Sequence, residues 1–260
     1  MVKKRQIKKL LTIADGFGDS KAVPDWYPNF FKWPEIIGLM TQDLEVVNLS
    51  RYGAGNEYII QSIRHNCTDI DVALVQWAMP NRLDLVLGNP DKFWDEQISQ
   101  DPVYNNNIVD VGKDRYWISS GSNNPYVLEY HGKYIRSRQH QLRSQLFVEH
   151  AKLLLRSAGI EHGFMLSYDG EYLKESVTDF SNWIWHSPFR GMHSFRRVSK
   201  FSHLDFNYIQ PVSLIQFDFV KQFIMPAFDL CWRSPKDIDA VENMLYQDHK
   251  QAMLLKNDSI

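Results

Sequence analysis

The sequence predicts an α/β fold in which helices connect the strands of a parallel sheet, and three observations carry this prediction. Short apolar runs occur at residues 9–14, 44–48 and 71–77, each followed by a turn with glycine, proline or polar residues. Segments with a helical spacing of apolar residues lie between them. This order places the residues that follow the strands together at the carboxyl edge of the sheet, where open α/β folds bind ligands. Function is therefore expected at that edge.

Two helices are predicted to connect these strands. Residues 33–40 have Pro34 in the first turn, where proline fits a helix. Residues 56–63 form the second helix, with Asn56 as the cap at its start. Its apolar face consists of Tyr58, Ile59 and Ile63.

The second half of the chain supplies a long helix and a fourth strand. Residues 139–158 form the clearest helix, which Gly159 ends, and residues 160–168 form the strand. The helix is expected to bury a stripe of Leu142, Leu146, Phe147, Ala151, Leu154 and Leu155. Residues 212–217 have a strand-like pattern.

The last predicted helix covers residues 237–255, where Ser234 and Asp237 have capping-box spacing. Its buried face consists of Ile238, Val241 and Leu245. Two irregular stretches, at about 82–136 and 169–211, are interpreted as insertions into a single domain of residues 1–260. Insertions at carboxyl strand ends commonly form a lid or a partner surface.

Composition narrows the class of protein. Lysine and arginine total 29 against 31 aspartate and glutamate, a net charge of -2, so no nucleic-acid partner is expected. Two cysteines without metal-ligand spacing suit a reducing compartment. The apolar run at residues 10–14 is too short for a signal peptide, and no run approaches the ~18 residues of a membrane span. We therefore expect a cytoplasmic protein without metal, cofactor or membrane contact.

Three motifs follow the predicted strands in order. Gly18-Asp19-Ser20 follows the first strand, residues 48–53 (Asn to Gly) the second, and residues 76–81 (Gln to Asn) the third. In this order they resemble the SGNH (GDSL-type) hydrolase family. The resemblance implies a flavodoxin-like three-layer sandwich with parallel strand order 2-1-3-4, decorated by the two insertions. Similar SGNH-like proteins occur in tailed bacteriophages, which would place the protein in a host cytoplasm or a virion.

The resemblance also implies site residues. Ser20 would be the nucleophile and the Gly53 amide an oxyanion donor, with Asn56 at the same edge. The third-motif asparagine is either Asn81, after a shift from the family pattern, or absent. Arg82 can bind a carboxylate or phosphate on a ligand.

The register of the first motif has two alternatives. If the strand ends at Ala14, the Gly-Asp-Ser position of the family falls on Ala14-Asp15-Gly16, and Asp15 lies there without a nucleophile. If a longer loop follows the strand, Ser20 supplies the nucleophile.

The catalytic base of the family is missing from its usual place. That family carries Asp-x-x-His near its C-terminus, and none of the nine histidines here has an acidic residue three positions before it. Trp232 occupies the corresponding position. His186, His203 or His249 would have to act as the base instead.

Two functional classes remain open. One is a protein that keeps the SGNH-like fold, has lost or altered the hydrolase chemistry, and serves as a binding or structural protein through its aromatic insertions. The other is an active serine esterase or deacetylase acting on a small O-acylated substrate such as an acetylated sugar. Exposed aromatic rings suit carbohydrate or protein partners.

Overall fold

The computed structural model contains most of the helices and strands predicted from the sequence. The described residues are 7–19, 27, 30–80, 82, 84–87, 108–111, 114–118, 137–170, 181–184, 191–204 and 211–258.

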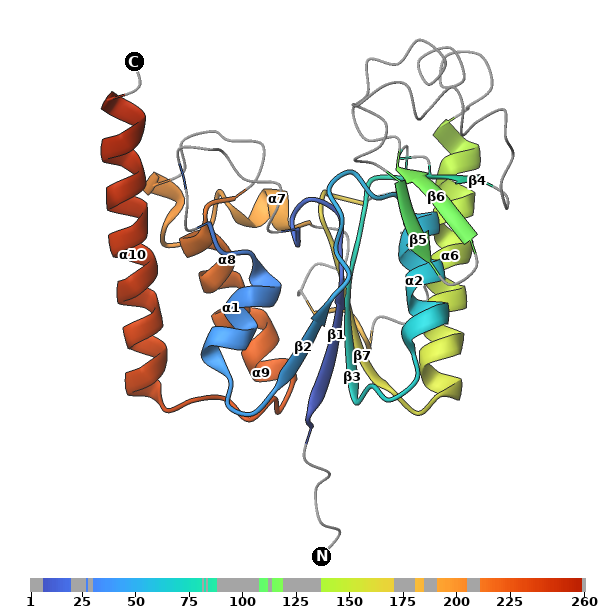
Figure 1. The fold of residues 1–260 in the computed structure, drawn as a ribbon, viewed down its shortest axis with the longest axis horizontal. Coiled ribbons are helices and arrows are strands. Elements are labelled where there is room, and N and C mark those ends of the chain that lie inside the picture. The colour runs from blue at the N-terminus through green and yellow to red at the C-terminus, as the bar shows by residue number, and fades with distance from the viewer. Residues whose placement is uncertain are drawn as a thin grey trace, which may run out of the picture.

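A four-stranded parallel sheet forms the centre of the molecule (Figure 1). Its strands are β1 (Lys9–Ile13), β2 (Glu45–Asn48), β3 (Val72–Trp77) and β7 (Glu161–Leu166), in the order β2-β1-β3-β7. Thr12 lies opposite Leu74, and Leu11 lies opposite Val47. The predicted order 2-1-3-4, with the first strand inside the sheet, is confirmed.

Helices cover both faces of this sheet, because its side chains alternate between two apolar clusters. Leu10 packs into a cluster with α1 (Trp33–Met40), α8 (Ser213–Phe219) and α10 (Pro235–Asp258). Leu11 and Ile13 pack on the other side, with α2 (Asn56–Asn66) and α6 (Ser137–Ser157). The result is an α/β structure compatible with a flavodoxin-like sandwich.

A second, antiparallel sheet lies in the first irregular stretch. Its strands are β4 (Asp84–Leu87), β5 (Ile108–Val111) and β6 (Asp114–Ile118), in the order β4-β6-β5, and β4 and β5 contact α2. These strands lie among loop-like residues with no helical pattern between them, so the sequence did not distinguish them from the irregular stretch. Residues 88–107 and 119–136 of this irregular stretch lie outside the described residues.

The strand predicted at residues 212–217 is wrong, because this segment is the helix α8. All seven residues of α8 are buried. A helix that is buried on all sides lacks a polar face, and its short apolar run cannot be distinguished from a buried strand by periodicity. The remaining short elements are α7 (Met192–Phe195), η2 (Ser202–Leu204), the π-helical turn η3 (Val220–Ile224) and α9 (Met225–Ala227).

The apolar stripe predicted for α6 is partly wrong. Leu142 and Leu146 are exposed to solvent, as is Leu153. The face that packs on the molecule instead carries His140, Ser144, Val148, Ala151 and Leu155. Small side chains on this face let α6 approach α2, its main helical neighbour.

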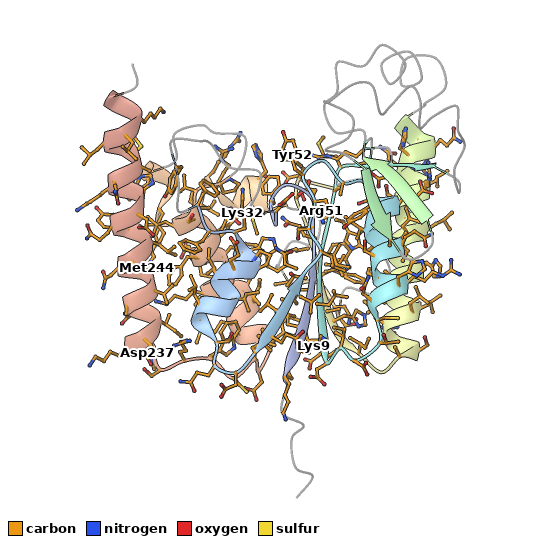
Figure 2. All side chains as sticks on the ribbon, in the orientation of Figure 1. Lys9, Lys32, Arg51, Tyr52, Asp237 and Met244 are labelled. Carbon is orange, nitrogen blue, oxygen red and sulfur yellow. The ribbon has the colours of Figure 1, made fainter. Side chains whose placement is uncertain are left out.

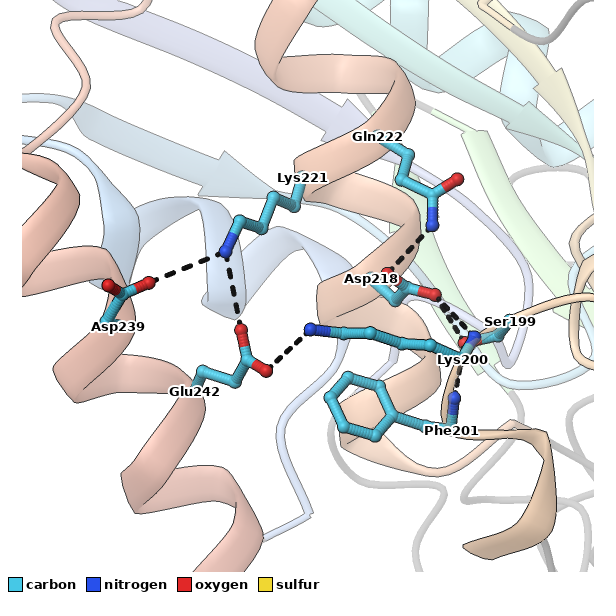
Figure 3. Close-up of polar contacts among 8 residues, drawn as sticks. All are labelled: Ser199, Lys200, Phe201, Asp218, Lys221, Gln222, Asp239 and Glu242. Atoms are coloured by element: carbon cyan, nitrogen blue, oxygen red, sulfur yellow. Dashed lines mark hydrogen bonds and ion pairs between the residues drawn. The ribbon is translucent and has the colours of Figure 1, made fainter.

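A polar cluster joins α10 to the segment formed by α8 and η3 (Figure 3). Lys221 Nζ lies 3.5 Å from Asp239 Oδ1 and 3.4 Å from Glu242 Oε2, and Lys200 Nζ lies 2.6 Å from Glu242 Oε1. Behind them, the buried carboxylate of Asp218 accepts a hydrogen bond from the Lys200 backbone N–H. At the start of α10, the Asp237 N–H donates to Ser234 Oγ at 3.3 Å, as the capping-box spacing predicted.

None of the described helices is both long and apolar enough to cross a membrane.

Candidate functional site

The turn after β1 buries a carboxylate at the carboxyl edge of the sheet. β1 ends at Ile13, and Asp15 follows with no exposed surface. The Phe17 N–H donates to Asp15 Oδ1 at 3.1 Å, and the Gly18 N–H donates to the Asp15 carbonyl at 3.0 Å. Burial raises the pKa of Asp15, and the nearby Arg82 guanidinium acts in the opposite direction. The turn therefore holds one acid in a fixed, dry position.

Residues after two other strands meet Asp15. Arg82, which follows β3, places Nη2 3.6 Å from Asp15 Oδ2. Ser167, which directly follows β7, lies close enough to lower the pKa of Asp15, although its Oγ makes no hydrogen bond of ordinary geometry. Three strand ends thus contribute one acid, one guanidinium and one hydroxyl to the same place.

Several of these buried polar atoms lack hydrogen-bond partners in the described part of the chain. Asp15 Oδ2, Arg82 Nη1 and Ser167 Oγ accept or donate no hydrogen bond there. Ser50 Oγ and Arg51 Nε, in the residues that follow β2, are also buried without a hydrogen-bond partner there. An unsatisfied buried polar group costs about 1–3 kcal/mol, so a cluster of them marks a place where ordered water or the polar groups of a ligand would be stabilised.

A lysine is buried beside the same turn. Lys32 has no exposed surface, and its Nζ lies 4.3 Å from the centre of the Phe30 ring. Burial lowers the pKa of Lys32 to about 7, although the acids Asp19, Glu35 and Asp15 all favour its charged form. In Figure 2, Lys32 and Arg51 lie in the upper half of the molecule and Tyr52 above them, whereas Lys9 at the start of β1 lies toward the lower end. A base that is partly neutral near pH 7 therefore lies at the carboxyl edge.

The loop after β2 is fixed to the β1 turn. The Asn48 side chain donates to the Gly18 carbonyl at 2.9 Å, and the Tyr52 N–H donates to Asp19 Oδ2 at 2.7 Å. Gly53 has a φ of 81°, a left-handed conformation that strongly favours glycine. Its conformation alone explains the glycine, and its role as an oxyanion donor stays a prediction.

Asn56 holds the ends of several elements together. Its Oδ1 accepts the Ala78 N–H at 2.8 Å, and its Nδ2 donates to the Ala78 carbonyl at 3.2 Å and to Ser144 Oγ at 2.9 Å. These bonds connect the end of β3 to α2 and α6. Asn56 was predicted to cap α2, and this is wrong, because the N-cap position is Gly55.

Asp84, the first residue of β4, caps α2 instead. Its Oδ1 accepts the Gly55 N–H at 2.9 Å, and its Oδ2 accepts the Tyr58 N–H at 2.7 Å. A Cβ atom on Gly55 would lie 2.9 Å from Asp84 Oδ2, so glycine permits this close approach. Burial raises the pKa of Asp84 to about 6 despite the two N–H donors.

The candidate bases occupy different places. His249, on α10, is buried with its Nδ1 3.3 Å from the Tyr27 hydroxyl, and His203 is exposed on η2. The structure brings another histidine to the strand ends: the His193 N–H donates to the Ser167 carbonyl at 2.9 Å, and its ring stacks on Tyr168 at 5.0 Å. Nothing in the sequence around His193 indicates this position.

Tyr168 extends the site toward α7. Its ring packs edge-on against Phe17 at 5.4 Å. Burial raises the pKa of Tyr168, Asp15 adds to this, and Arg82 and Arg196 oppose it. The Tyr168 hydroxyl therefore belongs to the same electrostatic neighbourhood as the Asp15 and Arg82 pair.

A small pocket adjoins Arg82 on the side of α6. Arg82, Glu57, His140, Arg143 and Ser144 are among the residues that line it, and Arg143 forms an ion pair with Glu57. The cavity volume is about 10 Å³, close to the ~10–15 Å³ that one water molecule requires. The pocket therefore has room for about one water molecule.

The structure thus brings Asp15 and Arg82 together, with Gly53 and Asn56 in the residues after β2. Ser20, Asn81 and His186 lie outside the described residues, so their convergence on this edge stays a prediction. No group of three metal-ligating side chains occurs within the described ranges.

No protein-family model, curated protein or solved structure matches the chain at a significant level.

Proposed function

We propose that this protein binds a small polar ligand at the carboxyl edge of its sheet and has lost or altered the serine chemistry of the family that it resembles. The main observation in support of this proposal is the cluster of buried polar atoms without hydrogen-bond partners on Asp15, Arg82 and Ser167. A carboxylate accepts, a guanidinium donates, and a hydroxyl does both. A ligand with several hydroxyl or carbonyl groups would satisfy all three.

The end of β1 supports the loss of serine chemistry. Because β1 ends at Ile13, Asp15 and Gly16 occupy the positions directly after the strand, where the resembled family has aspartate and serine. Glycine has no side chain that can act as a nucleophile. Ser20 comes later in the chain, beyond the turn that Asp15 fixes.

Aromatic rings at the edge favour a carbohydrate or an O-acylated sugar as the ligand class. Tyr52 is the exposed aromatic side chain of the loop after β2, and Tyr168 borders the Asp15 and Arg82 pair. Aromatic faces supply apolar contact area while the polar groups nearby fix orientation.

The alternative function is hydrolysis of a small O-acyl ester through Ser20. The observation in its favour is His193, which brings an imidazole to the same edge as Ser167 and Tyr168. An activated serine needs such a base within hydrogen-bond reach. A fluorophosphonate probe separates the two functions: labelling that disappears in Ser20→Ala would support the esterase, and we expect labelling to be weak or absent.

Ligand binding is tested by calorimetry with neutral, acetylated and acidic sugars. We expect at least one class to bind. Asp15→Asn should weaken its binding by about tenfold or more, because a hydrogen bond to a charged group contributes ~1.5–3 kcal/mol. Ser167→Ala should weaken it by about two- to tenfold, because a hydrogen bond between neutral groups contributes ~0.5–1.5 kcal/mol. Asp218→Asn is the matched control, since Asp218 is equally buried but lies in the cluster beside α10. Unchanged affinity in Asp15→Asn, with the fold retained, would exclude this site.

A further inference from the structure

Exposed apolar side chains concentrate on two helices. Eight large hydrophobic side chains are exposed in the described residues, and six of them lie on α6 and α10. On α6 these are Leu142, Leu146 and Leu153, with 47%, 70% and 66% of their surface exposed; on α10 they are Met244, Leu254 and Leu255, with 37%, 67% and 42%. Scattered surface leucines are normal, but aligned ones mark interaction surfaces.

The leucines of α6 form a narrow stripe. At 3.6 residues per turn, Leu142, Leu146 and Leu153 fall within about 40° of one another around the helix axis. Basic side chains border this stripe toward both ends of the helix, since Arg138 and Arg156 are exposed next to it. Glu149 is the one acid of α6. We call this surface the α6 stripe.

The exposed line of α10 has the same length and the opposite charge. Met244 and Leu255 are 11 residues apart, as Leu142 and Leu153 are, which corresponds to about 16 Å along a helix. Asp237 and Asp248 lie within about 40° of this line, while Glu242 turns toward Lys200 and Lys221. We call the surface of Met244, Leu255, Asp237 and Asp248 the α10 stripe.

The two helices lie on opposite sides of the molecule (Figure 1). In that view α6 descends from Ser137 to Ser157, whereas α10 ascends from Pro235 to Asp258. A neighbouring copy shifted along the long axis would therefore place its α10 antiparallel to α6. Antiparallel helices align their dipoles favourably, and the basic and acidic borders attract each other.

We propose that copies of this chain associate head to tail, with the α6 stripe of one copy packed against the α10 stripe of the next. Such a contact uses two different surfaces of the chain, so each added copy exposes a new binding surface, and assembly continues unless the rotation between copies closes a ring. One helix pair buries less than a standard interface, so the association is weak and depends on concentration and salt.

Association is measured by sedimentation velocity over a range of protein concentrations. We expect the average mass of the parent to rise above that of the monomer, and expect added salt to reduce it. Leu146→Glu and Met244→Lys should each weaken self-association by at least tenfold, because each replaces an apolar side chain of one stripe by a charge that repels the charged border of the other. Val198→Glu is the matched control, since Val198 is also exposed but lies on neither helix.

Mixing the two variants tests the head-to-tail arrangement itself. The Leu146→Glu protein keeps an intact α10 stripe, and the Met244→Lys protein keeps an intact α6 stripe. A mixture should therefore form one-to-one dimers that grow no further. Association of Met244→Lys alone would show an α6-to-α6 contact, and association of Leu146→Glu alone an α10-to-α10 contact. Either result, or a parent that stays monomeric at all concentrations, would overturn the proposal.

Discussion

At the scale of single residues, the Asp84 carboxylate both caps α2 and makes the stability of the protein depend on pH. Its carboxylate accepts the backbone N–H groups of Gly55 and Tyr58, which the start of α2 would otherwise leave without partners. The same carboxylate is buried, and burial raises its pKa from 3.8 to about 6. In the folded state this acid therefore binds a proton more readily than in the unfolded chain.

We predict that the Asp84 contribution to stability falls as the pH rises from about 4 to about 6. Between these values the folded state binds more protons than the unfolded state, so the free energy of unfolding decreases with increasing pH. A pKa shift of about two units corresponds to about 3 kcal/mol. In Asp84→Asn this component is absent, so the stability of the variant relative to the parent should improve by up to about that amount between pH 4 and pH 7.

Urea denaturation at several pH values measures this difference. Asp239→Asn is a suitable control, because Asp239 is largely exposed and faces Lys221. Parallel stability profiles for the parent and Asp84→Asn would show that Asp84 does not titrate in this range.

The candidate site shows which residues a sequence can reveal. Asp15 and Arg82 were recognised because each follows an apolar run that became a strand. Asp84 and His193 were missed because their partners, Gly55 and Ser167, are 29 and 26 residues away in the chain. No local pattern records a contact of that kind, since it depends on how the elements pack.

At the scale of elements, α6 has one face that packs and one that faces solvent. We predict that Val148→Ala, on the packed face, lowers the free energy of unfolding by about 1–2 kcal/mol, through lost burial and a small cavity. Leu146→Ala, on the exposed face of the same helix, should change it by less than about 0.5 kcal/mol. Thermal or urea denaturation of the two variants measures the difference, and a larger cost for Leu146→Ala would mean that another part of the chain covers this face.

Elements with a clear period were predictable, and elements without one were not. The strands β1, β2, β3 and β7, and the helices α1, α2, α6 and α10, each carried periodic apolar residues or a turn signal. The buried helix α8 has no polar face, and β4, β5 and β6 lie among loop-like residues with no helical pattern between them. The buried apolar face predicted for α6 was partly wrong because leucine gives the same apolar pattern whether a helix packs it or leaves it exposed.

At the scale of the whole molecule, the two faces of the sheet are covered by different parts of the chain. The helices α2 and α6 lie between or next to the strands in sequence. On the other face, α1 is local, but α8 and α10 come only after all four strands. The apolar cluster of that face includes Leu74 and Met165 from the strands and Ile238 and Leu245 from α10.

This order has a consequence for synthesis on the ribosome, where the N-terminal part of a chain emerges first. The sheet can assemble once β7 has emerged, yet one of its faces is covered only in part, mainly by α1, until residues 213–258 follow. We predict that a chain truncated after residue 211 binds a hydrophobic dye strongly and aggregates, whereas the full chain does neither. Comparable dye binding by the truncated chain and the full chain would mean that α8 and α10 cover little of this face. During synthesis, the growing chain would expose part of this apolar surface for the interval between β7 and α10.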